Sequence, residues 1–161
     1  MGCTDPAYAN YDPLATMDDG SCAGCLGNSV AIEMFDSFGD GWNGNNLTIT
    51  STTNGTVYGP FTILTGSTGL ETFCLPNDCY AVVCDGGSWQ GEVSWTMVDQ
   101  TGTVVLSGGA PFNQNAGIGT ACPVFGCTDP TALNYDSLAT ADDGSCAYLC
   151  DPYVATAVID A

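Results

Sequence analysis

Lysine, arginine and histidine are all absent from this 161-residue sequence, whose only charged side chains are 18 carboxylates, 15 Asp and three Glu. Nucleic-acid binding needs basic side chains against phosphate, and an anionic membrane surface also selects a basic face. A Ser-His-Asp or Cys-His centre needs a histidine. The composition therefore excludes these three classes. Paired carboxylates such as Glu33 and Glu92 could in principle hydrolyse glycosides, but nothing in the sequence places them together, so we expect no enzyme. Because no Lys, Arg or His can pair with them, the carboxylates must be solvated, cap backbone N–H groups or bind a cation from outside the chain.

Long apolar runs are also lacking, so we expect no insertion into a membrane. Met1 is followed directly by Gly-Cys-Thr-Asp-Pro, with no basic or apolar leader. We expect that a leader has been removed or that the sequence is a segment of a longer protein.

The kind of acid suggests which cation would bind. Short Asp carboxylates beside Asn and Gly suit oxygen-lined loops around a hard ion, which predicts calcium as the cofactor. Zinc fits poorly, because the ten cysteines include a single Cys-x-x-Cys, Cys22 to Cys25, without a matching second pair. A dense, even set of cysteines in a small acidic chain instead indicates disulfides, and hence a secreted or cell-surface protein.

The chain contains an internal duplication. Residues 2–22 (GCTDPAYANYDPLATMDDGSC) recur without a gap at residues 126–146 (GCTDPTALNYDSLATADDGSC), an offset of 124. The same offset maps residues 30–36 onto residues 154–160. We therefore divide the chain into a first Cys/Asp-rich motif, a large domain, a second motif and a terminal strand, at residues 1–24, 25–122, 123–149 and 150–161.

The large domain has the pattern of an all-β protein. Short β-prone runs alternate with Gly, Asn, Asp and Pro clusters, and no helical periodicity is present. In residues 92–99 the alternation places Val93, Trp95 and Met97 on one buried face. Eight such runs predict an antiparallel β-sandwich of jelly-roll type. The predicted strands are Val30–Phe35, Asn46–Thr52, Thr56–Tyr58, Thr62–Leu64, Leu70–Cys74, Tyr80–Cys84, Glu92–Asp99 and Thr103–Ser107.

Residues 35–46 (FDSFGDGWNGNN) are the strongest candidate for a calcium loop. They place Asp and Asn oxygens among glycines that let the chain bend back, although the spacing is not that of an EF-hand. The alternative is a wide hairpin in which these side chains cap their own backbone. The candidate ligands are Asp36, Asp40, Asn43 and Asn45.

Each Cys/Asp-rich motif is a 20-residue loop from Cys to Cys with too few apolar residues for a core, so we expect disulfides Cys3–Cys22 and Cys127–Cys146. Closing a loop of this size stabilises by roughly 3 kcal/mol. The oxygens in these loops either bind a metal or only form turns, and both interpretations remain open. The candidate ligands are Asn10, Asp12, Asp18 and Asp19 in the first copy and Asn134, Asp136, Asp142 and Asp143 in the second.

Two smaller predictions concern covalent modification. Cys74 and Cys79 flank a four-residue turn and are candidates to pair with each other. Asn46 and Asn54 each begin an Asn-x-Thr sequence, the acceptor pattern for N-glycosylation.

The repeated motif resembles the GCTDPxAxNYDPxATxDDGSC repeats of large secreted and surface-attached proteins of aquatic microbes, with Ser137 in place of the usual Pro. FDSFGDGWNGNNL, together with GEVSW, resembles the β-rich DSxGDGWNG domain that accompanies those repeats. The resemblance covers nearly the whole chain. It implies an extracellular, modular, disulfide-bonded and calcium-dependent surface or fibrous protein, and implies no enzymatic activity.

Two classes of function are compatible with these features. In the first, the chain is a structural unit of an extracellular filament or stalk, with copies of itself as partners. The lone strand at residues 154–160 would then pair with a sheet of a continuing polypeptide or of the next subunit, and a head-to-tail contact of this kind would propagate. The alternative is that it folds back onto the chain's own sandwich and the molecule is a monomer. Its pairing faces contain Val154, Thr156, Val158 and Ile159. In the second class it is a carbohydrate-binding or adhesion module that holds glycans through calcium and the turn aromatics Trp42, Trp89 and Tyr58.

Overall fold

The computed structural model describes residues 1–6 and 8–149. Its strands are β1 (Asn28–Asp36), β2 (Asn46–Ser51), β3 (Val57–Phe61), β4 (Thr68–Leu75), β5 (Asp78–Asp85), β6 (Val93–Asp99), β7 (Val104–Gly109), β8 (Phe112–Ile118), β9 (Phe125–Gly126) and β10 (Ala141–Asp142). One short 3₁₀ helix, η1 (Gln90–Glu92), precedes β6. None of the described residues forms a helix that could span a lipid bilayer.

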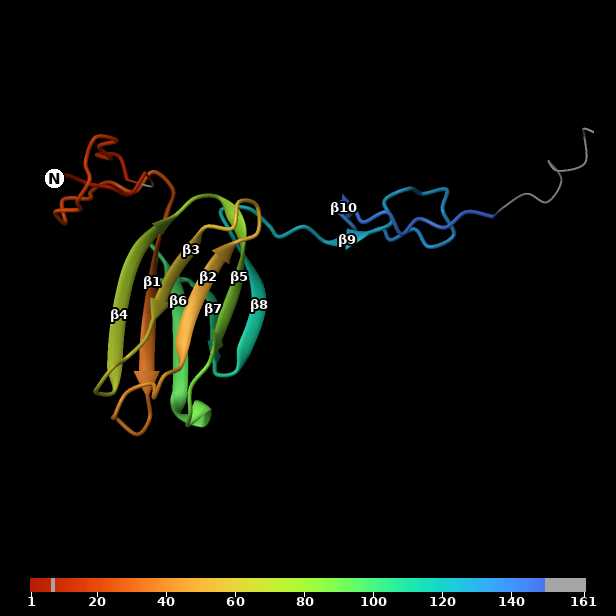
Figure 1. Cartoon of the computed structure of the whole chain (residues 1–161). Coiled ribbons are helices and arrows are strands. Elements are labelled where there is room, and N and C mark those ends of the chain that lie inside the picture. The colour runs from red at the N-terminus through yellow and green to blue at the C-terminus, as the bar shows by residue number, and fades with distance from the viewer. Residues whose placement is uncertain (7, 150–161) are drawn as a thin grey trace, which may run out of the picture. The chain divides into compact units, whose positions relative to one another are not determined.

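Strands β1 to β8 form two four-stranded antiparallel sheets that pack face to face (Figure 1). One sheet has the order β4-β1-β6-β7 and the other has the order β3-β2-β5-β8. The predicted all-β sandwich is confirmed, whereas the jelly-roll connectivity is not. Seven of the eight predicted runs overlap these strands. The exceptions are Thr62–Leu64, which lies in the loop after β3, and β8, which the pattern missed.

The core lies between the two sheets and follows the period-two alternation of the strands. In β1 the inward positions are Val30, Ile32 and Met34, and the paired strand β6 contributes Val93, Trp95 and Met97, as predicted. Trp95 stacks edge-on against Phe112, with 4.9 Å between the ring centres. The same alternation carries Asp36, the last residue of β1, onto the inward face.

Two disulfides close the small motifs, and two more brace the sandwich. The predicted pairs Cys3–Cys22 and Cys127–Cys146 are present. The suggested pair Cys74–Cys79 is wrong, because Cys74 bonds to Cys25 and Cys79 bonds to Cys122. Cys74 lies near the end of β4 and Cys79 near the start of β5, and their partners Cys25 and Cys122 lie in the segments that enter and leave the sandwich.

The chain divides into two compact units, Met1–Cys122 and Pro123–Ala161. The predicted boundary after residue 122 coincides with this division, while the first motif belongs to the same unit as the sandwich. Within that unit the first motif lies at the end of the sandwich where β1 begins (Figure 1). The predicted pairing strand, residues 154–160, lies outside the described residues.

The two motifs share one internal geometry, as their duplication predicts. In each copy an Asn side chain bridges two distant backbone groups: Asn10 donates to Ser21 O and accepts from Ala23 N, and Asn134 does the same with Ser145 and Ala147. The bridge from Cys3 to Tyr11 likewise recurs from Cys127 to Tyr135. This geometry explains how a loop without a core is ordered.

Peptide mapping without reduction should recover the four disulfides described above, together with a free thiol at Cys84 that stays unreactive in the folded protein. Cys84 is fully buried in β5, and burial, assisted by the charge of Asp85, raises its pKa to about 11. A buried thiol that remains protonated reacts slowly. Trypsin has no cleavage site in this sequence, so digestion at Asp and at aromatic residues is required. A Cys74–Cys79 peptide, or rapid alkylation of Cys84 before unfolding, would contradict the structure.

Candidate functional site: an acidic cluster at one end of the sandwich

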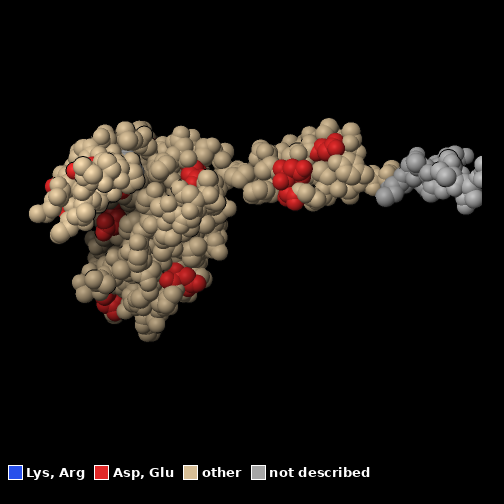
Figure 2. All heavy atoms as spheres, turned by 45° about the horizontal axis from the view of Figure 1, so that its top comes forward, with Lys and Arg blue, Asp and Glu red and all other residues tan. Residues whose placement is uncertain are grey.

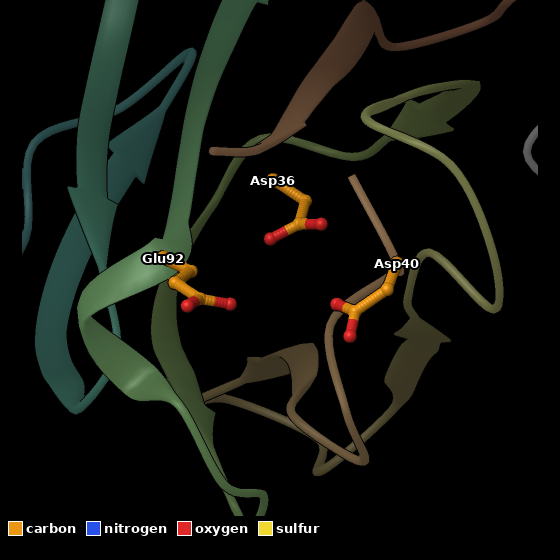
Figure 3. Close-up of side chains that lie close together, drawn as sticks. All are labelled: Asp36, Asp40 and Glu92. Atoms are coloured by element: carbon orange, nitrogen blue, oxygen red, sulfur yellow. The ribbon is translucent and has the colours of Figure 1, made fainter. Parts of the chain in front are cut away.

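Three carboxylates meet at the end of the sandwich where β1 ends and β6 begins (Figure 3). They belong to Asp36, Asp40 and Glu92, and one oxygen from each lies within 4.8 Å of the others. Asp36 ends β1, Asp40 lies in the β1–β2 loop and Glu92 ends η1. Among the described residues this is the one such group of three acidic side chains.

The pairing of β1 with β6 brings Glu92 to Asp36. In the antiparallel register Asp36 lies opposite Val93, the residue after Glu92, and Ser37 N donates to Glu92 O at 3.0 Å. Two carboxylates that are 56 residues apart in the sequence (92 − 36) therefore lie side by side. Their attachment to a central strand pair fixes this part of the site.

Asp36 is buried, with 4% of its surface exposed. Its Oδ2 accepts hydrogen bonds from the backbone N–H groups of Gly39 (2.6 Å) and Gly41 (3.0 Å). Its Oδ1 is buried and has no hydrogen-bond partner. A buried carboxylate oxygen without a hydrogen-bond partner raises the free energy of the folded protein. A cation bound at Oδ1 would offset this cost.

The surroundings shift the acidities of two carboxyls in the cluster in opposite directions. Desolvation acts to raise the pKa of Asp36, but N–H donors from Gly41, Gly39, Phe38 and Asp40 outweigh it and lower the pKa. Desolvation also raises the pKa of Glu92, and there the charges of Asp36 and Asp40 add to it. The folded protein therefore holds Asp36 ionised beside a Glu92 that resists ionisation, a conflict that a bound cation would relieve.

Glycine is required where the loop bends around Asp36. Gly41 has φ of 102°, and a Cβ there would lie 2.7 Å from Ile63 O. Trp42 follows and inserts into the core, with its indole N–H donating to Phe35 O at 2.9 Å. The loop is thereby anchored beneath the carboxylates.

Asn45 connects this loop to the turn that carries Glu92. Its side chain is fully buried and donates to Trp42 O (2.8 Å) and Ser88 O (2.7 Å), while its Oδ1 accepts from Gly87 N (3.0 Å). The prediction that Asn45 is a metal ligand is therefore corrected: its polar atoms bind backbone, and its role is to hold the two loops together.

The predicted ligand Asn43 contacts the cluster through its side-chain amide. Its amide donates to Asp40 Oδ1 and to Gly41 O, both at 2.9 Å, so it orients a carboxylate of the cluster. The predicted ligands Asp36 and Asp40 are brought together in the structure, and Glu92, which no local pattern in the sequence included, lies beside them. Glu92 begins the predicted strand Glu92–Asp99, and it is the pairing of that strand with β1 that brings it to Asp36.

The carboxylates of the two small motifs are arranged differently. Asp12, Asp18 and Asp19 each accept a backbone N–H two residues ahead, and their counterparts in the second copy repeat this. This is the turn-forming role that the sequence left open as the alternative to metal binding. In the described residues these side chains do not form an acidic group of three like that of Asp36, Asp40 and Glu92. On the face shown in Figure 2 the acidic side chains lie in separate patches, and the sequence has no Lys or Arg to lie beside them.

The three aromatic side chains predicted to contact sugar differ in how far they are exposed. Trp42 is buried in the core, and Tyr58 is half-buried against Phe73 and Tyr80, so neither forms a free platform. Trp89 is 70% exposed, as predicted. The acceptor candidates Asn46 and Asn54 are half-buried and exposed respectively, and Asn54 lies in the turn between β2 and β3.

Comparisons of the chain with protein-family models, with curated proteins and with solved structures found no match.

Proposed function

We propose that this chain is an extracellular structural module, used in tandem or head to tail in a filament or surface stalk, whose sandwich is stabilised by calcium at the Asp36–Asp40–Glu92 cluster. The observation that carries the calcium site is Asp36 Oδ1, which is buried and unpartnered beside two further carboxylates. Calcium prefers carboxylate oxygens and tolerates irregular geometry, as a loop-and-strand site requires.

The extracellular assignment is supported by the four disulfides in the described residues, which persist in oxidising compartments. The modular assignment is supported by the two small motifs, which repeat both a sequence and its hydrogen bonds. Copies of the chain are the proposed partners.

The position of β1 bears on how such modules would join. β1 is a central strand, with β4 paired on one side and β6 on the other. The position in this sheet that corresponds to residues 154–160 is therefore already occupied by β1. We therefore propose that these residues pair either at an edge strand of a neighbouring copy or as the opening strand of a following sandwich.

Thermal unfolding in calcium and in EDTA tests the proposal. With calcium at about 100 times its Kd, the folded protein gains about 2.7 kcal/mol by mass action, which raises the Tm of a domain this size by roughly 10 °C. An Asp36→Asn variant, which keeps acceptor capacity for Gly39 and Gly41, should lose this response. Magnesium at the same concentration is the ionic-strength control, and coincident melts in calcium and EDTA would reject the site.

A further inference from the structure

A pocket of about 200 Å³ opens directly beside the acidic cluster. It is lined by Phe38, Asp40, Trp89 and Glu92, so it shares two carboxylates with the proposed calcium site. The other two lining residues are large aromatics that remain 74% and 70% exposed, Phe38 and Trp89 respectively. Exposed aromatic rings beside convergent polar groups are typical of a small-ligand site.

The backbone at Trp89 is fixed, although its side chain is 70% exposed. Its backbone is left-handed, with φ 53° and ψ 39°, a conformation that bulky residues rarely adopt. The preceding residue is fixed on both sides, because Ser88 N donates to Asn43 O (3.1 Å) and Ser88 O accepts from Asn45. The Asn45 hydrogen bonds that join the two loops thus also fix the backbone from which Trp89 projects, and a preorganised backbone lowers the entropic cost of binding.

The proposed ion would have coordination positions to spare. Calcium takes six to eight oxygen ligands. Because Asp36 Oδ2 already accepts from Gly39 and Gly41, Asp36 offers Oδ1 alone, and the three carboxylates then supply at most five oxygens, one from Asp36 and two from each of the others. Because Asp40 and Glu92 line the pocket, a ligand in the pocket can reach the ion. The chemistry that fits is a pair of neighbouring hydroxyls for the ion and an apolar ring face for the aromatics.

We infer that this pocket binds a neutral sugar residue of a glycan, with two vicinal hydroxyls on calcium and the ring face against Trp89 and Phe38. This inference rests on the proposed function, since it requires the calcium site. The sugar is neutral because the net charge of −18, including three carboxylates at the site itself, repels an anionic sugar. Phe38 thereby replaces Trp42 and Tyr58 among the sugar-contacting aromatics expected from the sequence.

The test uses the methyl glycosides of mannose, galactose and fucose as probes, titrated into the full chain in calcium and in EDTA. Trp42 and Trp95 are buried, so a sugar-induced change in tryptophan fluorescence reports on Trp89. We expect at least one of the three glycosides to give a saturable change in calcium and none to do so in EDTA. Calcium binding itself is measured separately by isothermal titration calorimetry.

Variants then locate the sugar. Phe38→Ala and Trp89→Ala should each weaken binding by roughly fivefold or more, the factor expected for losing one aromatic contact. Saturation-transfer NMR reads sugar binding in these variants, because Trp89→Ala removes the fluorescent reporter. Phe125→Ala is the matched control, since Phe125 is also exposed but belongs to the second motif. Calcium affinity should be unchanged in all three.

The outcomes separate the two proposals. Calcium binding without binding of any of the three glycosides would overturn the sugar site alone, as would sugar binding that persists in EDTA or is unaffected in both aromatic variants. Absence of calcium binding would overturn the proposed function and this inference together.

Discussion

A Glu92→Gln variant will bind calcium about tenfold more weakly than the wild type, or worse, yet will be the more stable protein once the ion is removed. The loss of affinity follows from removing one of three charged ligands. The gain in stability follows because Glu92 in the ion-free protein is an ionised group beside Asp36 and Asp40, in surroundings that raise its pKa. Glutamine removes that repulsion at nearly constant shape.

The stability difference between Glu92→Gln and the wild type should depend on pH. A carboxyl whose folded pKa lies above its usual value of 4.5 binds its proton more tightly in the folded state. Its favourable contribution is complete below pH 4.5 and is lost as the pH rises through the raised pKa. In EDTA, the stability advantage of Glu92→Gln should therefore be present at pH 7 and should vanish in acid, where Glu92 is neutral.

Glu33→Gln is the matched control. Glu33 lies on β1, opposite Thr96 of β6, and is exposed on the outer face of the same sheet. The same chemical change there should alter neither calcium affinity nor stability in EDTA beyond small surface effects. Equal behaviour of the two variants in both measurements would show that Glu92 is not part of a cation site.

The strands of the sandwich could be predicted because their side chains alternate. Val93, Trp95 and Met97 face the core as their spacing requires, and the turns contain the Gly, Asn and Asp residues that turns need. The pattern failed at β8, an edge strand whose residues 113–115 are Asn-Gln-Asn and lack β-branched side chains. It also failed at Thr62–Leu64, a β-prone run that is not a strand. This run packs against the β1–β2 loop instead, because Ile63 is buried and its carbonyl accepts from Trp42 N.

The candidate site could be predicted only in part because it combines local and long-range contacts. Asp36 and Asp40 follow from the composition of one loop, and the inward alternation of Val30, Ile32 and Met34 already points Asp36 into the sandwich. Glu92 depends on which strand pairs with β1 and in what register, which no local pattern specifies. Trp42 was misjudged for a similar reason: its Gly- and Asn-rich surroundings indicate an exposed turn, whereas its ring anchors that turn in the core.

Replacing Asn45 by alanine will destabilise the sandwich by about 3 kcal/mol, more than any other single amide in the loop. The change removes three hydrogen bonds at a fully buried position and leaves Gly87 N and Ser88 O without the partner they had. Asn45 is completely covered, so the alanine side chain would leave an unfilled space at a position that water does not reach in the wild type. Chemical denaturation of the wild type and variant, both in EDTA, measures this difference without any contribution from calcium.

Asn46→Ala provides the control one residue away. Asn46 is half-buried, and its side chain donates one hydrogen bond, to Gly44 O at 2.8 Å. Its loss should cost less than about 1 kcal/mol. Asn45→Ala should in addition weaken calcium binding, because Gly87 and Ser88 lead into the turn that carries Glu92, and should change the emission of the exposed Trp89. If Asn45→Ala were as stable as Asn46→Ala and bound calcium as the wild type does, the two loops would be held together by other contacts and the clamp assigned to Asn45 would be wrong.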